Sequence, residues 1–306
     1  MDNKQDRLTY EKKILIRSEQ VDMTRRLRMS ELFRIMEEAS IAHTEELGCT
    51  RDRTLDRGLL WIITRQQAEI EELPAYDEEI IVRSWQGDMM HVFFPRFYEI
   101  ERAGRVIVRG QALWMLLDEE SRQMVMPEDY DIFIPGRPGS DDIMLAPVVI
   151  PSELREGESG NDVNSGAGAG IVIRQDLVTR FSQVDINGHM NNTRYFDIID
   201  DALYTLHSAA HNGETGYAER NDGSKGCSNG CSNAGTGTGK MIPRLVRANY
   251  LSELRAGDCF TLTGYSDRGA GSAADNAAAD GIDTGTTVYF EGADTDRVKF
   301  RIAYSF

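Results

Sequence analysis

In the second half of the chain, a short polar segment carries side chains that could do chemistry. Residues 185–192 read DINGHMNN and stand where a strand-like run gives way to a helix-like one. The amide of Asn187 could polarise a carbonyl group or hold a water molecule, and the imidazole of His189 could move a proton near neutral pH. Asp185 could orient both side chains, and Gly188 permits the tight turn that aims them together. Unpaired backbone N–H groups at the helix start could stabilise a developing oxyanion.

This segment has a counterpart in the first half of the chain. Residues 17–39 align without a gap with residues 180–202, at a constant offset of 163 positions. The sequence therefore predicts an internal duplication. The identical pairs are Arg17/Arg180, Gln20/Gln183, Val21/Val184, Asp22/Asp185, Phe33/Phe196, Ile35/Ile198 and Ala39/Ala202.

The two copies differ where the chemistry would lie. Thr24 stands in the position of Asn187. Arg26 stands in the position of His189. Because only the second copy has the amide and the imidazole, we expect one active site per chain.

The same residue types also have ordinary structural roles. Asp and Asn before a helix serve as caps and turn formers, and a single His is commonly structural. Asp22 occupies the matching turn without an Asn or a His, which favours an architectural role for Asp185. The combined cluster at one helix start, rather than any one residue, favours an active site.

Each copy shows the same order of elements. In the first copy, apolar residues recur every three or four positions from Leu32 to Leu47, which predicts one amphipathic helix. Such a helix, followed by an antiparallel meander, must bury its apolar stripe on one face of the sheet. We therefore expect an α+β fold in which a sheet wraps around a long helix, twice. The acidic residues Glu37, Glu38, Glu45 and Glu46 take other faces of the helix. The expected strands are 12–16, 60–69, 79–85, 92–101, 105–117, 123–125, 171–181, 243–253, 259–265, 286–291 and 298–305, and the second helix is expected at 192–207.

The duplication divides the chain into two domains. We expect an N-terminal domain at residues 1–146, a linker rich in Gly, Ser and Asn at 147–170, and a C-terminal domain at 171–306. Residues 212–240 and 267–284 are low in complexity and cannot bury enough apolar area to offset the entropy of ordering, so they are expected to be disordered insertions.

Composition excludes several classes of protein. The 306 residues include 34 Lys and Arg and 50 Asp and Glu, a net charge of −16, which argues against nucleic acid or an anionic membrane as partner. The N-terminal sequence is charged where a signal peptide would be apolar, and no run approaches the ~18 apolar residues of a membrane span. A cytosolic, soluble protein is expected. Cys227 and Cys231 lack a second pair of ligands, so we expect no zinc, no other metal and no cofactor.

The polar segment resembles a motif of the acyl-acyl carrier protein thioesterases, a family with a tandem (double) hotdog fold. The family pattern Asp-x-Asn-x-His-x-Asn-Asn-x-x-Tyr is matched at Asp185, Asn187, His189, Asn191, Asn192 and Tyr195. Residues 83–122 are similar to the Trp-rich hairpin of the family, which ends in Trp-x-x-x-Asp. Residues 249–258 resemble the segment that brings a Glu to the Asn and His, which assigns that role to Glu253.

The resemblance implies hydrolysis of a fatty acyl-acyl carrier protein thioester by water, which ends chain elongation. A thiol with a pKa of about 8.5 leaves easily, so the site mainly positions a water molecule and stabilises the oxyanion. His189 and Glu253 are the candidates to deprotonate the water, and the choice between them stays open. Asn187 and helix-start amides would hold the carbonyl, and Asp185 would orient Asn187 or His189. Glu253 could equally be a solvent-facing carboxylate at a strand end.

The resemblance also places an apolar acyl tunnel in the first hotdog. Its helix would contribute Phe33, Met36 and Ala39, each of which could equally be ordinary core. The three tryptophans Trp61, Trp85 and Trp114 are expected to serve packing.

An acidic carrier protein requires a local positive surface on this acidic chain. Arg25, Arg26 and Arg28 are candidates for it, although a solvated turn explains them equally well.

Other readings keep the same fold. The substrate could be an acyl-CoA or an aromatic CoA thioester. A hotdog dehydratase is disfavoured by the Asn-x-His-x-Asn-Asn run, and a non-catalytic acyl-thioester binding module gives no reason for the polar cluster to occur in one copy only. A monomer and a homodimer are both compatible with tandem hotdogs.

Overall fold

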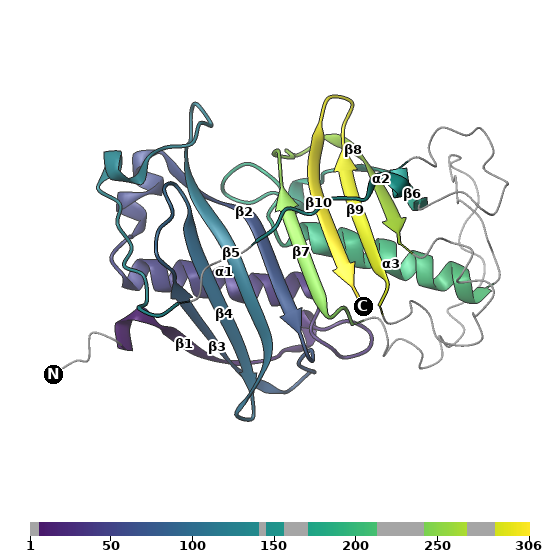
Figure 1. Ribbon diagram of the computed structural model, residues 1–306, viewed down its shortest axis with the longest axis horizontal. Coiled ribbons are helices and arrows are strands. Elements are labelled where there is room, and N and C mark those ends of the chain that lie inside the picture. The colour runs from purple at the N-terminus through teal and green to yellow at the C-terminus, as the bar shows by residue number, and fades with distance from the viewer. Residues whose placement is uncertain (1–5, 141–144, 156–170, 213–241, 268–284) are drawn as a thin grey trace.

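The computed structural model describes residues 6–140, 145–155, 171–212, 242–267 and 285–306 (Figure 1). The low-complexity tracts, apart from Asn212 and Asp267, lie outside the described residues, as do Cys227 and Cys231. The first half contains β1 (Tyr10–Leu15), α1 (Met29–Glu46), β2 (Leu59–Ile70), β3 (Glu79–Gln86), β4 (Phe94–Arg102) and β5 (Arg105–Asp118). The second half contains β6 (Ile171–Val178), α3 (Arg194–Asn212), β7 (Leu245–Tyr250), β8 (Cys259–Ser266), β9 (Thr287–Ala293) and β10 (Val298–Ser305), and a short helix α2 (Ser152–Arg155) precedes it.

The strands form one antiparallel sheet that runs through both halves. Its order is β1-β3-β4-β5-β2-β7-β10-β9-β8-β6, so the second half repeats the first in mirrored order. The halves join where β2 pairs with β7, from Arg65 opposite Asn249 to Glu69 opposite Leu245. Each half has the hotdog arrangement of a long helix wrapped by an antiparallel sheet, which confirms the predicted α+β class.

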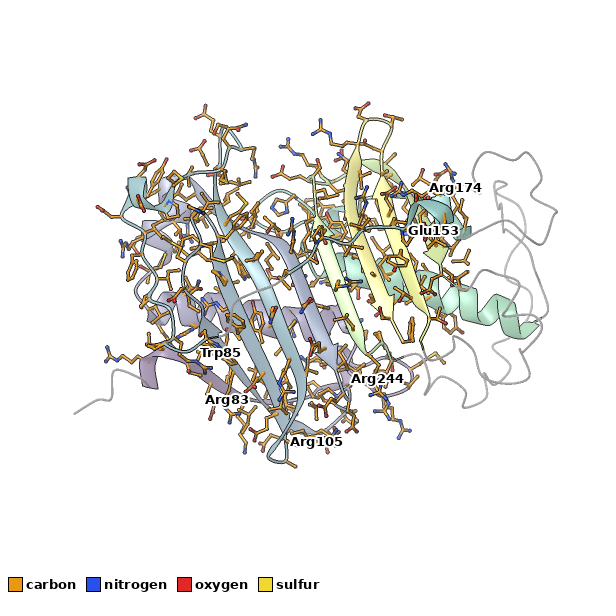
Figure 2. The ribbon with its side chains drawn as sticks, viewed as in Figure 1. Arg83, Trp85, Arg105, Glu153, Arg174 and Arg244 are labelled. Carbon is orange, nitrogen blue, oxygen red and sulfur yellow. The ribbon has the colours of Figure 1, made fainter. Side chains whose placement is uncertain are left out.

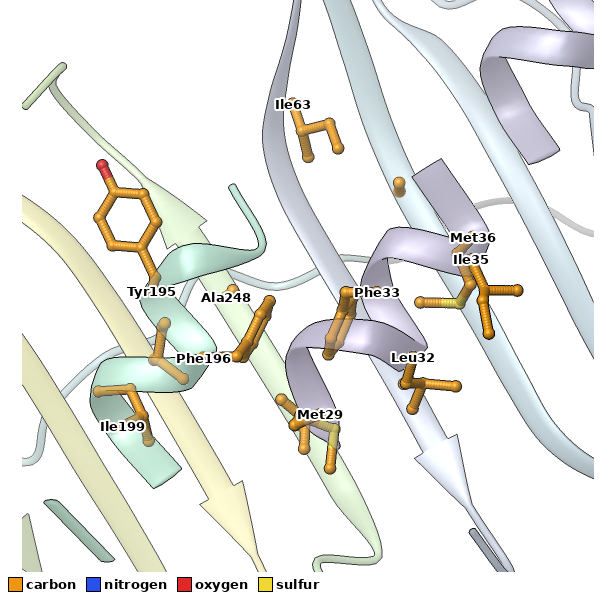
Figure 3. Close-up of a cluster of buried hydrophobic side chains, with 14 of the residues drawn as sticks. Met29, Leu32, Phe33, Ile35, Met36, Ile63, Tyr195, Phe196, Ile199 and Ala248 are labelled. Atoms are coloured by element: carbon orange, nitrogen blue, oxygen red, sulfur yellow. The ribbon is translucent and has the colours of Figure 1, made fainter. Parts of the chain in front are cut away.

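Both long helices lie against the same face of the sheet (Figure 1). Where they meet, Phe33 and Phe196 stack with ring centroids 4.0 Å apart and planes 5° apart. These residues are equivalent in the duplication, so the chain packs one position against its own repeat, as in a two-fold dimer. Figure 3 shows the two rings facing each other between the helices, close to Ala248 of β7.

Several predicted boundaries differ from the observed ones. β6 ends at Val178, before a 3₁₀ turn at Phe181–Gln183, because the side chain of Gln183 accepts the N–H of Arg180 and turns the chain. β7 ends at Tyr250 instead of residue 253, and residues 123–125 contribute only an isolated bridge between Leu117 and Met124. None of the described helices is both long enough and apolar enough to cross a membrane.

Residues 145–155, which include the start of the predicted linker, cross the face of the sheet opposite the two long helices (Figure 1). Leu145 packs with Trp85, Phe97 and Leu113 of the first half. The N–H of Val148 donates to Asn249 at the junction (2.8 Å). Further along, Ile150 and Leu154 pack with Tyr265 of the second half, and Arg155 pairs with Glu291 (2.6 Å). Apolar residues therefore tie this segment to both halves.

Phe196→Ala is expected to destabilise the chain by about 3–5 kcal/mol, because it removes a fully buried ring at the contact between the halves. Chemical denaturation measures the change. Phe133→Ala is the control, since Phe133 is 68% exposed, and it should change stability by no more than about 0.5 kcal/mol. Equal losses in the two variants would contradict the importance of the stack.

Candidate active site

The polar turn of the second half is built around Asp185. One oxygen of its carboxylate accepts the backbone N–H of Asn187 (2.8 Å), and the other accepts the side-chain amide of Asn191 (3.2 Å). Gly188 closes the turn with a φ of 78°, in the left-handed region that favours glycine. Asp185 therefore fixes where Asn187 lies, which is a positioning role.

The first half contains the same turn without the chemistry. Asp22 accepts the N–H and the hydroxyl of Thr24, both at 2.7 Å. Arg25 takes the left-handed conformation (φ 65°) in the position of Gly188. The backbone bond from Asp22 to Arg26 (2.9 Å) also repeats, from Asp185 to His189 (3.1 Å). The turn is thus common scaffold, and only its side chains differ between the copies.

His189 is buried, and its two ring nitrogens have different surroundings. Nδ1 lies 3.3 Å from the carbonyl oxygen of Met190. A carbonyl oxygen only accepts, so this contact assigns the proton to Nδ1 and leaves a lone pair on Nε2. Nε2 is buried without a hydrogen-bond partner among the described residues. One ring nitrogen of His189 is therefore an acceptor without a donor among the described residues.

Glu253 reaches the turn through an arginine of the other half. The Arg122 guanidinium donates to the Glu253 carboxylate (3.2 Å) and to the carbonyl oxygen of Asn187 (3.3 Å). The N–H of Met190 also donates to the carbonyl of Leu254 (2.7 Å). The other oxygen of Glu253 accepts from Arg255 (3.4 Å). The structure thus brings Glu253 to the turn of Asn187 and His189 by its ion pair and its backbone.

No pattern in the sequence points to Arg122, although it lies four residues after the Trp-x-x-x-Asp motif. Asp118 ends the Trp-x-x-x-Asp pattern, and its carboxylate accepts the N–H and the hydroxyl of Ser121 (2.7 Å each). This tight turn places Arg122 in the left-handed region (φ 56°). That the turn faces the second half depends on the pairing of the halves, which no local pattern reveals.

The helix-start amides are mostly occupied within the turn. Asn191 accepts the N–H (2.9 Å) and the hydroxyl (2.7 Å) of Thr193 with its side chain. Its carbonyl accepts the N–H of Arg194 (2.9 Å), and the carbonyl of Thr193 accepts that of Phe196 (3.2 Å). The expectation of several free donors at this helix start is therefore not met. The side-chain amide of Asn187, to which no described residue hydrogen-bonds, is the available donor.

Tyr195 and Tyr250 pack behind the turn. Tyr195 lies in edge contact with Tyr250 (5.2 Å between centroids) and with Phe300 (4.7 Å). The hydroxyl of Tyr250 donates to the carbonyl of Asn192 (2.9 Å) and accepts from Gln66 of β2 (2.6 Å). The last residues of the motif thus anchor the turn to the junction between the halves.

A cavity of roughly 280 Å³ opens beside this turn. Asn187 and Ile186 of the second half form part of its wall, and the remaining lining residues come from the first half, including α1, β2, β4 and β5. His189 and Glu253 do not lie on the wall. Typical ligand cavities are about 300–1,000 Å³, so this cavity suits a small ligand.

The cavity wall differs from the one expected. Phe33, Met36 and Ala39 are buried in the core and do not line the cavity. They are therefore ordinary core residues, which was the alternative expectation for them. Trp61 and Trp114 do line it, so the expectation that they serve packing alone is wrong. Trp85 packs on the other face of the sheet, where Figure 2 labels it. The Cζ atom of Arg137 lies 3.8 Å from the centroid of the Trp85 ring.

Glu37 of α1 belongs to the site, although the sequence placed it on a polar face. Its side chain lines the cavity and faces the turn of the second half. Burial, together with the charge of Asp185, raises the pKa of Glu37 to about 7, although a hydrogen bond from Asn191 acts to lower it. Asp200, the equivalent residue of α3, likewise has a pKa raised to about 7, mainly by burial, but is held by Tyr304 (3.0 Å). Of these two carboxyl groups, Glu37 is the one that also lies on the cavity wall.

The first half also has acidic residues, Glu71 and Glu72, in the place equivalent to Glu253, and they are ordinary surface carboxylates. Glu71 pairs with Arg105 (2.8 Å), and Glu72 pairs with Arg102 (2.6 Å). The guanidinium of Arg244 donates to the carbonyl of Glu71. Figure 2 shows Arg105 and Arg244 at the lower end of the sheet.

The three arginines expected to dock a carrier protein do not form one exposed patch. Arg25 is exposed, whereas Arg26 is half-buried and donates to the carbonyl of Leu73 (3.4 Å). Arg28 is also half-buried and donates to the carbonyl of Glu19. Among the residues that the structure describes, no cluster of His, Cys, Asp or Glu could hold a metal ion.

Similar proteins share this fold at low sequence identity. An acyl-ACP thioesterase of Bacteroides thetaiotaomicron superposes with a TM-score of 0.62 at 16% identity, over 99% of this chain and 100% of that one. A 12:0-ACP thioesterase of Umbellularia californica gives a TM-score of 0.62 at 14% identity, over 97% and 96%. The fold is therefore the tandem hotdog of these structures.

Curated relatives match part of the sequence. An acyl-[acyl-carrier-protein] hydrolase of Cuphea viscosissima is 25% identical over 206 residues, 62% of this chain and 46% of that protein. A dodecanoyl-[acyl-carrier-protein] hydrolase of Umbellularia californica is 23% identical over 213 residues, 65% and 53%. The chain spans about half the length of the curated relatives it matches.

The fold and the site define a tandem hotdog protein with a polar turn in one half and a cavity in the other. The family model for the acyl-ACP thioesterase N-terminal domain matches residues 7–132, and the model for the C-terminal domain matches residues 171–212. Together they cover more than half of the chain, one in each half. The chain belongs to the acyl-ACP thioesterase family.

Glu37→Gln is expected to flatten the pH dependence of the unfolding free energy between about pH 4.5 and 7. Folding raises the pKa of Glu37 from 4.5 to about 7, so the folded chain binds more protons in this window and loses stability as the pH rises. The variant should remove a decrease of about 3 kcal/mol, measured by denaturant unfolding across the window. Glu128→Gln, at an exposed position whose charge is not among those that raise the pKa of Glu37, should keep the wild-type slope. A wild-type slope in Glu37→Gln would show that its pKa is not raised.

Proposed function

We propose that this chain hydrolyses fatty acyl-ACP thioesters to free fatty acid and holo-ACP, which ends chain elongation. The observation that carries the proposal is the meeting of two different halves at Asn187. The first half supplies a cavity lined by Trp61, Phe94 and Trp114, which suits an acyl chain. The second half supplies the amide and the imidazole of one turn. The similar proteins named above, which are acyl-[acyl-carrier-protein] hydrolases, support the same reaction.

In this proposal the thioester carbonyl lies at Asn187, with the acyl chain in the cavity. The amide N–H of Asn187 donates to the oxygen that becomes negative as water attacks the acyl carbon. Nε2 of His189 accepts a proton from the water, because it is the buried nitrogen without a partner. The C–S bond then breaks, and the leaving thiolate receives the proton from His189. Water and thioester thus give acid and thiol without a covalent intermediate.

Glu253 has a different part in this proposal. Both of its oxygens already accept N–H groups, from Arg122 and from Arg255, which makes it a poor acceptor for a proton of water. Its charge instead favours the imidazolium that forms at His189. Together with Arg122 it holds the backbone carbonyl of Asn187, and so aims the amide of that residue.

The carrier-protein substrate, the absence of nucleic acid and membrane among the partners, and the cytosolic location stay predictions. An acyl-CoA substrate is the competing choice. Comparison of kcat/KM for ACP and CoA esters of one acyl chain separates the two, because hydrolysis of the CoA ester alone would retain the chemistry and reject the carrier protein.

Substitutions in the polar turn of the second half should lower turnover, whereas substitutions in the equivalent turn of the first half should not. Asn187→Ala is expected to reduce kcat by about 10²–10³-fold, since it removes an oxyanion donor. His189→Ala should reduce it by about 10²–10⁴-fold through loss of the base. Release of free fatty acid from a panel of acyl-ACP substrates measures both. The controls are the equivalent residues of the first half, Thr24→Ala and Arg26→Ala, which should keep wild-type turnover. Full activity in His189→Ala would reject the proposed mechanism.

Arg122 should act on turnover through the position of Asn187. Arg122→Ala is expected to lower kcat by up to about 10²-fold with little change in KM, because a small displacement of an aligned group costs that much. Arg255→Ala removes the other guanidinium of Glu253 but no contact to Asn187, and should change kcat far less. Equal effects of the two variants would mean that Arg122 acts only by pairing with Glu253.

A further inference from the structure

A buried arginine lines the cavity away from the polar turn. Arg96 of β4 is 2% exposed and forms part of the cavity wall. Its guanidinium donates to Nδ1 of His43 (2.7 Å) and to the hydroxyl of Thr44 (2.6 Å). These two bonds leave three of its five N–H groups without an acceptor among the described residues. No described carboxylate forms an ion pair with it.

The contact with His43 does not neutralise the guanidinium. Because a guanidinium only donates, Nδ1 of His43 accepts, and its proton is on Nε2, which donates to the carbonyl of Arg7 (3.1 Å). Burial and the charge of Arg96 lower the pKa of His43 to about 4, so the imidazole is neutral at pH 7. Burial lowers the pKa of Arg96 only to about 10, so its positive charge remains.

A second donor lies beside Arg96. Gln86 of β3 stands opposite Arg96 in the sheet register, is 1% exposed and lines the same cavity. Its side-chain nitrogen is buried without a hydrogen-bond partner among the described residues. Buried donors without acceptors are costly, and a buried charge without a counter-charge costs more. Two such groups on one cavity wall indicate that the occupant of the cavity supplies the acceptor.

The donors lie at a distance from the proposed reaction centre. Glu37 marks the part of α1 that faces the polar turn, whereas Arg96 binds Thr44, seven residues further along the helix. At a helical rise of 1.5 Å per residue, this separation is about 10 Å. An acyl group whose carbonyl lies at Asn187 would therefore bring its far end to Arg96 and Gln86.

We propose that the acyl group bound in this cavity carries an oxygen acceptor at its distal end, and that this oxygen, best a carboxylate, binds Arg96 and Gln86. The inference rests on the proposed thioester hydrolysis for the direction in which the acyl group lies. A carboxylate satisfies both the charge and the geometry of a guanidinium, because its two oxygens accept parallel N–H groups. A methyl terminus would leave all of these donors unsatisfied.

Three ACP thioesters of equal carbon number test the proposal: octanoyl, ω-hydroxyoctanoyl and the half-thioester of octanedioic acid. The wild-type chain should hydrolyse the half-thioester with a kcat/KM about 10- to 100-fold above that of octanoyl-ACP, with the hydroxyl between them. Arg96→Met should reverse this order, and Gln86→Met should weaken it. Arg83→Met is the control, since Arg83 of β3 pairs with Glu11 and Glu101 outside the cavity, and should keep the wild-type order.

Binding of non-hydrolysable analogues separates this proposal from the proposed reaction. The N-ethyl amide of octanoic acid and the N-ethyl half-amide of octanedioic acid are titrated by calorimetry into the wild-type chain and Arg96→Met. If no thioester is hydrolysed but the half-amide binds more tightly to wild type alone, the reaction fails and the role of Arg96 stands.

A wild-type preference for methyl-ended ligands, in hydrolysis or in binding, would overturn the proposal. If Arg96→Met does not fold, Gln86→Met and the wild-type order decide it. An unchanged order in every folded variant would also overturn it.

Discussion

The pairing of β2 with β7 is the constraint on which the rest of the molecule depends. It turns two five-stranded sheets into one and places both helices on the same face, where Phe33 stacks on Phe196. Because these rings are the same position of the duplication, the halves are related as in a two-fold dimer. Each helix therefore faces the turn of the other half: Glu37 lies by Asn191, and Asp200 accepts a hydrogen bond from the backbone of Met29.

In the proposed function, the chemistry depends on side chains that differ between the two copies, while the backbone of the turn is the same in both. Asp22 and Asp185 hold the same turn, so the backbone of this turn forms with different side chains at its other positions. The second copy displays an amide and an imidazole there, while the first copy contributes the cavity beside them. The segment 145–155 adds to the fixed geometry, because it crosses the outer face and binds Asn249 at the junction. The site thus belongs to the pair of halves and not to either alone.

Local patterns predicted much of this architecture. The gapless offset of 163 positions identified the duplication, and the spacing of apolar residues indicated the helices and most strands, since both depend on neighbours in the chain. The motif around Asp185 indicated the polar turn for the same reason. Strand ends were predicted less well, as at β6, because a single side-chain hydrogen bond of Gln183 ends the ladder.

Residue types and spacing by themselves determined the two-copy α+β plan, the family resemblance and the turn that carries Asn187 and His189. Tertiary structure alone decided that Arg122 reaches Glu253, that Glu37 faces a cavity, and that Trp61 and Arg96 line it. These contacts join residues that are far apart in the chain. In the sequence, charged residues such as Glu37 and Arg96 look the same as charged residues of the surface. Packing of α1 against the sheet removes Arg96 from water, and the turn of the other half lies against Glu37. Burial then gives both groups their altered pKa values.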